Sequence, residues 1–91
     1  MTFEESAQRV GEQLCELYNQ QNLPAVDGLF ATVDEALARH VHNQVSRRTF
    51  WVEVEKGFYA AGPLFIKQAN SSLHALMKLI EARLSDRQSV R

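Results

Sequence analysis

The sequence has few of the residues that cross-link a chain, break helices or anchor it in a membrane. Its single cysteine, Cys15, excludes a disulfide within the chain, and there are only 2 prolines and 4 glycines among 91 residues. That composition excludes collagen-like and low-complexity proteins. The longer uncharged runs, such as 57–66, fall well short of the roughly 20 apolar residues of a membrane helix.

An excess of charge of one sign is also missing. The formal net charge is -1, and the basic residues are spread from Arg9 to Arg91. This pattern disfavours a protein whose main task is to bind a polyanion. The first ten residues carry acids where a signal peptide has lysine or arginine followed by an apolar run, so we expect a cytoplasmic protein.

What is present is an ordinary globular mixture, with 45% hydrophobic and 23% charged residues. The length fits one domain with a single core. We expect a single helical domain over residues 1–84, followed by a polar, frayed tail over residues 85–91.

Two helices are predicted in the first half of the chain. Thr2 and Glu5 form a capping-box pattern, which predicts a helix that begins there and ends near Tyr18 or Gln20. One apolar seam supports it, with spacings of three and four residues: Phe3, Ala7, Val10, Leu14 and Leu17. A second helix is predicted over 24–44, with Asn22 as its cap and a proline in its first turn.

The stretch 49–66 fits two structures. Alternating Phe50, Val52 and Val54 are typical of a strand, whereas apolar residues recurring every three or four positions indicate a helix capped by Ser46. We favour the helix, because a lone hairpin needs a covered face. With a last helix predicted over 64–85, the fold class is all-α, a small antiparallel bundle of about four helices. The alternative is α+β with a hairpin near 49–66.

Aromatic residues gather in this stretch, including two adjacent doublets, Phe50-Trp51 and Phe58-Tyr59. Neighbours on a helix point roughly 100° apart, so each doublet presents rings to two surfaces. We therefore expect a non-enzymatic protein-binding module, such as a regulator, adaptor, chaperone or inhibitor, whose partner is a second copy or another chain. The predicted binding residues are Phe50, Trp51, Val54, Phe58, Tyr59 and Phe65. The alternative is that all the rings fill the chain's own core.

Several words of the sequence resemble the helix-turn-helix repressors of bacteria and their phages. They are Ala36-Leu37-Ala38-Arg39, Val45-Ser46-Arg47-Arg48-Thr49, Glu55-Lys56-Gly57 and the leucine-rich segment 73–84. The resemblance implies a small DNA-binding regulator, with Ser46, Arg47 and Arg48 as phosphate contacts. The spacing departs from the family by two residues before Val45 and by one residue after Thr49, and insertions in this rigid motif are poorly tolerated.

No pattern for catalysis, a cofactor or a metal stands out. His40 and His42 are two residues apart, which places them on different sides of a helix, and a zinc site needs ligands that converge. The sequence has no glycine-rich phosphate loop and no nucleophile elbow. We therefore expect no enzyme activity, no cofactor and no metal.

Overall fold

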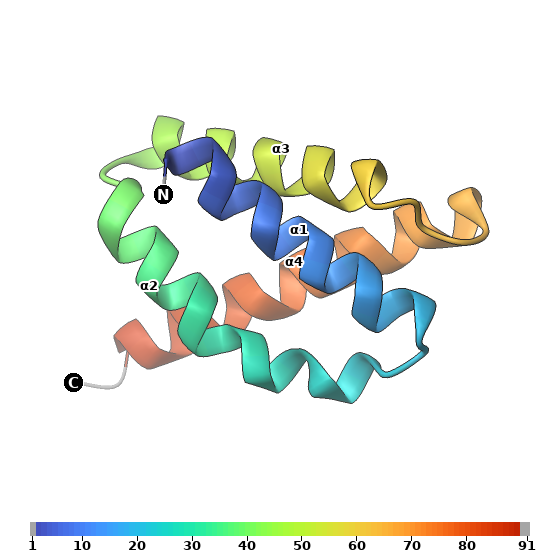
Figure 1. The fold of residues 1–91 in the computed structure, drawn as a ribbon. Coiled ribbons are helices and arrows are strands. Elements are labelled where there is room, and N and C mark those ends of the chain that lie inside the picture. The colour runs from blue at the N-terminus through green and yellow to red at the C-terminus, as the bar shows by residue number, and fades with distance from the viewer. Residues whose placement is uncertain (1, 90–91) are drawn as a thin grey trace.

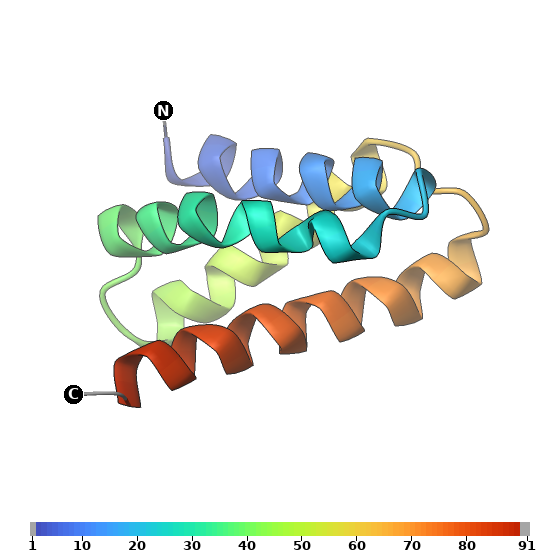
Figure 2. The same cartoon turned by 90° about the horizontal axis from the view of Figure 1, so that it is seen from below.

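The computed structural model describes residues 2–89, without the side chains of residues 23 and 84–89. The chain forms four α-helices and one 3-10 helix, and residues 2–89 contain no strand. The all-α prediction is confirmed, and the hairpin alternative is wrong. Successive helices run in opposite directions along the bundle, and α4 extends along nearly its full length (Figures 1 and 2).

The first helix, α1 (Phe3–Asn19), begins where the sequence predicts. The Thr2 hydroxyl accepts a hydrogen bond from the Glu5 amide at 3.1 Å and donates one to the Glu5 carboxylate at 3.0 Å. This differs slightly from the predicted box, in which the carboxylate reaches the Thr2 amide. Two residues after the helix ends, Gln21 adopts the left-handed backbone conformation, at φ 54°.

The second predicted helix is interrupted. Residues Leu23–Leu29 form the 3-10 helix η1, and α2 covers only Phe30–His40. Asn22 precedes η1 but its side chain makes no capping hydrogen bond, so that part of the prediction is wrong. At the far end the backbone becomes extended at Val41. The apolar periodicity continues past this point, but periodicity does not encode where a helix stops.

The third helix, α3 (Gln44–Ala60), confirms the helical interpretation of the aromatic stretch. Its cap is Asn43 rather than Ser46. The Asn43 side chain accepts from the Ser46 amide at 2.8 Å, and the Ser46 hydroxyl accepts from the Asn43 amide at 3.1 Å. The two residues form a reciprocal capping box, so Ser46 stabilises this terminus from inside the helix.

The last helix, α4, covers Ile66–Ser89. It begins two residues after the predicted start at Leu64 and continues beyond the predicted end at Ser85. Residues 85–89 of the predicted tail belong to this helix, and residues 90 and 91 lie outside the described chain.

Two glycines let α1 and α3 pack at backbone distance. A Cβ atom on Gly11 would lie 2.0 Å from the Val54 carbonyl oxygen, and one on Gly57 would lie 2.2 Å from the Gln8 carbonyl oxygen. Any larger residue would force the helices apart. This crossing is the reason that α1 keeps a glycine in its middle despite the loss of helix propensity.

All four α-helices contribute to one apolar core. Fully or nearly fully buried side chains include Ala7, Val10 and Leu14 of α1, Val33 of α2, Phe50, Val54 and Phe58 of α3, and Ala69, Leu73 and Ile80 of α4. The members from α1 and α4 follow the apolar seams in the sequence. The shared core holds α3 between α1 on one side and α4 on the other.

Candidate protein-binding surface

The two aromatic doublets of α3 do face two surfaces, and both surfaces belong to this chain. Phe50 packs edge-on against Phe3 of α1, with ring centroids 6.1 Å apart, while its neighbour Trp51 donates its indole N–H to Glu81 of α4. The second doublet, Phe58-Tyr59, also has one ring against α1 and one against α4. Phe58 lies 6.0 Å from the Tyr18 ring of α1, and the Tyr59 hydroxyl donates to Asn70 of α4 at 2.6 Å.

Most of the predicted binding residues therefore lie inside the bundle. Phe50, Val54 and Phe58 are completely buried, Trp51 is 8% exposed and Tyr59 is half-buried. The expectation that these rings exceed what the chain itself can bury is corrected: α1 and α4 cover both sides of α3. The core-filling alternative describes them better, and of the predicted set Phe65 alone is largely exposed, at 74%.

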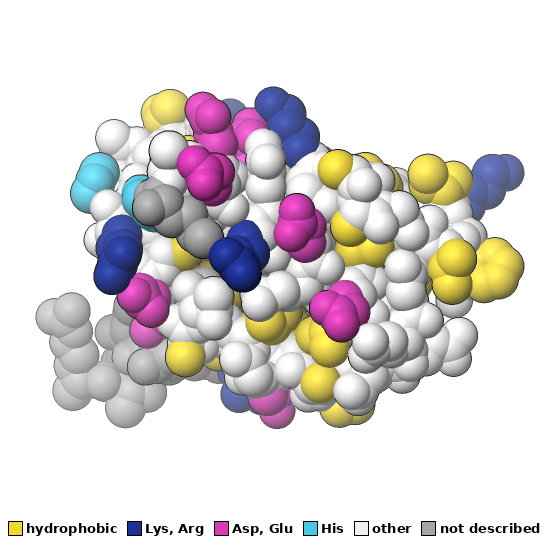
Figure 3. Space-filling model, viewed as in Figure 1, with side chains coloured by type: hydrophobic (Ala, Val, Ile, Leu, Met, Phe, Trp, Pro, Cys, Tyr) yellow, Lys and Arg dark blue, Asp and Glu magenta, His cyan; other side chains and the backbone are white. Residues whose placement is uncertain are grey.

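Phe65 belongs to a short exposed apolar segment, Leu64-Phe65-Ile66, which we term the 64–66 turn. The side chains are 54%, 74% and 65% exposed, respectively. In Figure 3, hydrophobic side chains gather at the end of the molecule where α3 connects to α4. Leu64 and Ile66 were not predicted as binding residues, because the predicted helix start at Leu64 assigned them to a regular helix with one buried face.

Hydrogen bonds from α1 hold this turn in place. The Asn19 side chain accepts from the Leu64 amide at 2.9 Å and donates to the Gly62 carbonyl at 3.3 Å, and the Tyr18 hydroxyl donates to the Leu64 carbonyl at 2.7 Å. Phe65 has φ 51°, in the left-handed region. That conformation costs a non-glycine residue of the order of 1 kcal/mol or more and persists only where the surroundings enforce it.

A pocket of about 290 Å³ lies beside the Phe65 ring. None of its lining residues carries a charge: Tyr18, Asn19, Gln21, Leu64, Phe65, Gln68 and Ser72. The 64–66 turn thus combines a protruding ring with an adjacent uncharged hollow.

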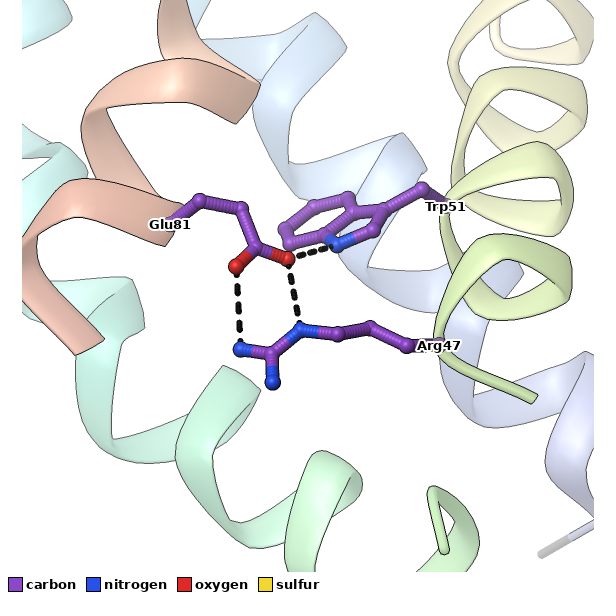
Figure 4. Close-up of polar contacts among 3 residues, drawn as sticks. All are labelled: Arg47, Trp51 and Glu81. Carbon is purple, nitrogen blue, oxygen red and sulfur yellow. Dashed lines mark hydrogen bonds and ion pairs between the residues drawn. The ribbon is translucent and has the colours of Figure 1, made fainter. Parts of the chain in front are cut away.

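A larger groove of about 700 Å³ lies between α3 and α4. Glu81 bridges it at one place, where its carboxylate accepts from Arg47 Nε at 3.0 Å, pairs with Arg47 Nη2 at 2.9 Å, and accepts from the Trp51 indole (Figure 4). Two side chains of α3, Arg47 and Trp51, thus donate hydrogen bonds to the Glu81 carboxylate. This cluster joins α4 to the first half of α3.

The residues proposed as phosphate contacts by the helix-turn-helix resemblance have different surroundings. Ser46 is engaged in the cap of α3, Arg47 is paired with Glu81, and Arg48 is exposed. The segment 55–57, which marks a loop in that family, lies within α3. The family's second helix exposes its reading face, whereas α3 is packed on two sides.

Two titratable groups outside these surfaces, Cys15 and Glu53, have pKa values shifted by their surroundings. Burial raises the pKa of the Cys15 thiol, which keeps it protonated and unreactive at neutral pH. The nearly buried Glu53 has its pKa lowered by hydrogen bonds from Lys56 and from Gln8 of α1. Among the described side chains, no three His, Cys, Asp or Glu residues gather as metal ligands.

Comparisons with family models, with curated proteins and with solved structures found no match to this chain. Within the described residues, no helix combines the length and apolar character that crossing a membrane requires.

Proposed function

We propose that this chain is a non-enzymatic protein-binding module, of the kind found in regulators, adaptors, chaperones and inhibitors, and that it binds through the 64–66 turn. The observation that carries the proposal is a run of three large exposed apolar side chains on a backbone fixed by Tyr18 and Asn19. Single exposed apolar residues are ordinary, but a contiguous group marks an interaction site.

The preorganised backbone supports this function. A loop that is already ordered loses little conformational entropy on binding. Full burial of a Leu, Ile or Phe side chain is worth about 1.5–3 kcal/mol. The left-handed conformation of Phe65 aims a large ring away from the bundle, and such strain is typical of sites selected for contact rather than for stability.

The partner whose surface matches this one is a second copy of the chain. A two-fold axis brings a surface patch against itself, so any charged residue near the axis meets its own like charge. The pocket beside Phe65 is lined only by uncharged residues. The hollow itself therefore presents no charge to the Phe65 ring of the other copy, and the neighbouring Lys67 lies outside its lining.

Molar mass in solution, measured by light scattering over a range of protein concentrations, tests this proposal. We expect a dimer for the native chain and a monomer for Phe65→Gly. Glycine removes the ring and also suits a positive φ, so the variant keeps its helicity. A native chain that stays monomeric at high concentration would overturn the proposed self-association.

Val45→Asp is the matched control. Val45 is 76% exposed, but it lies in the first turn of α3, at the other end of that helix from the 64–66 turn. We expect this variant to dimerise as the native chain does. If it dissociates as readily as Phe65→Gly, exposed apolar area in general causes the association, and the 64–66 turn has no special role.

A further inference from the structure

The groove between α3 and α4 has two helical walls. Arg48, Val52 and Glu55 line it from α3 at spacings of four and three residues. His74, Met77, Lys78 and Glu81 line it from α4. Each wall covers about two helical turns, which is roughly 10 Å of helix. The groove is therefore long enough for a short segment of regular structure.

The basic residues that line the groove differ in whether they already have an acidic partner. Arg47 is held by Glu81, but no hydrogen bond or ion pair within residues 2–89 engages the side chain of Arg48 or Lys78, and both residues are exposed. Arg48 belongs to the α3 wall and Lys78 to the α4 wall, so each wall of the groove carries one of these cations. The groove therefore offers unpaired positive charge on a chain whose net charge is -1.

Part of the lining of the groove is apolar. It consists of Trp51 and Val52 from α3 and Met77 from α4, and the Trp51 indole N–H is already bonded to Glu81. With 8% of its surface exposed, the Trp51 ring has no free face on which a nucleic-acid base stacks. An occupant that suits the groove presents apolar groups to these three side chains and carboxylates to Arg48 and Lys78.

We infer that the α3–α4 groove binds an acidic amphipathic helical segment of a partner protein. A helix laid in a groove anchors itself through apolar side chains on one face, while charges at the rim set orientation and partner choice. Here Val52 and Met77 receive the apolar face, and Arg48 and Lys78 pair with carboxylates beside it. This site is separate from the 64–66 turn and does not depend on self-association.

Trp51 is the only tryptophan in the chain and lies in the groove, so its fluorescence reports occupancy directly. The probe is a short synthetic helical peptide with leucines on one face and glutamates on the other, and its counterpart has lysines in place of the glutamates. We expect the glutamate peptide to shift the Trp51 emission saturably, with affinity that falls as salt is added. We expect the lysine peptide to bind about tenfold more weakly.

The double variant Arg48→Glu, Lys78→Glu reverses the charge at the groove, and circular dichroism verifies its fold. We expect this variant to bind the glutamate peptide about tenfold more weakly than the native chain does, and to bind the lysine peptide more tightly than the glutamate peptide. Arg9→Glu with Lys67→Glu makes the same change in net charge at exposed positions outside the groove and should bind as the native chain does. Equal response to both peptides, indifference to the double variant, or tighter binding of oligothymidylate would each overturn the inference.

Discussion

Gly11 illustrates how a residue that weakens its own helix can stabilise the molecule. Glycine lowers helix propensity by about 1 kcal/mol relative to alanine. At this position, however, the Val54 carbonyl oxygen and the Phe58 amide nitrogen occupy the space that a Cβ atom would need. A Cβ atom on Gly57 of α3 would likewise clash with the backbone of Gln8 on α1. The pair of glycines therefore sets the distance between α1 and α3.

Replacing Gly11 by alanine should destabilise the protein by about 1–3 kcal/mol, because the overpacked backbone contact outweighs the gain in propensity. Gly57→Ala should act in the same direction. Gly28→Ala is the control, since no atom lies within 4 Å of its added Cβ, and its effect should stay within about 0.5 kcal/mol. Urea unfolding followed by circular dichroism measures all three. A Gly11→Ala protein as stable as the native one would contradict the close crossing.

At the scale of the elements, the helices were predictable where local chemistry marks them. Thr2 and Glu5 indicate the start of α1, and the periodicity around Phe50 and Val54 favours helix over strand for α3. The sequence predicts the break between α2 and α3 a few residues too late, because Asn43 rather than the more obvious Ser46 is the cap of α3. Local signals specify which element forms better than where it ends.

Two side chains of α1, Tyr18 and Asn19, hold the connection between α3 and α4, and Asn19 supplies the acceptor for its backbone amide at Leu64. Asn19→Ala removes the acceptor of the Leu64 amide, at 2.9 Å in the native chain. The loss of one such bond is worth about 1 kcal/mol, so the Leu64 amide proton should exchange with solvent about fivefold faster in this variant. Hydrogen exchange followed by NMR measures this rate.

Asn22→Ala is the matched control for that experiment, because the Asn22 side chain makes no capping bond. It should leave the exchange of the Leu64 amide unchanged. If the Leu64 amide exchanges at the same rate in both variants, the Asn19 side chain does not hold the 64–66 turn. That result would contradict a preorganised turn.

For the whole molecule, the sequence predicts the fold class but places the aromatic surface wrongly. The doublets Phe50-Trp51 and Phe58-Tyr59 do indicate that α3 faces two neighbours. Nothing local reveals that α1 and α4 supply both, because this depends on helices far apart in the chain. Within the 64–66 turn, the sequence predicts only Phe65 as a binding residue, because it is aromatic. Its decisive feature, a backbone held by Tyr18 and Asn19, is a tertiary contact.

Because all four α-helices share one core, we expect the chain to unfold as one cooperative unit. Trp51 reports the packing of α3 against α4, whereas far-UV circular dichroism reports helices throughout the chain. We expect the two signals to give coincident unfolding curves in urea, as they do for a two-state domain. A fluorescence transition that precedes the loss of helicity would show that α4 detaches on its own and that the chain is not one cooperative domain.

The glycine crossing also constrains the order of events during synthesis on the ribosome. The backbone that Gly11 touches, at Val54 and Phe58, is translated more than forty residues after it. Until then the face of α1 that packs on α3 stays uncovered. The nascent chain must therefore leave this apolar face exposed until α3 has been made, which is the interval in which a chaperone that binds apolar segments has most to protect.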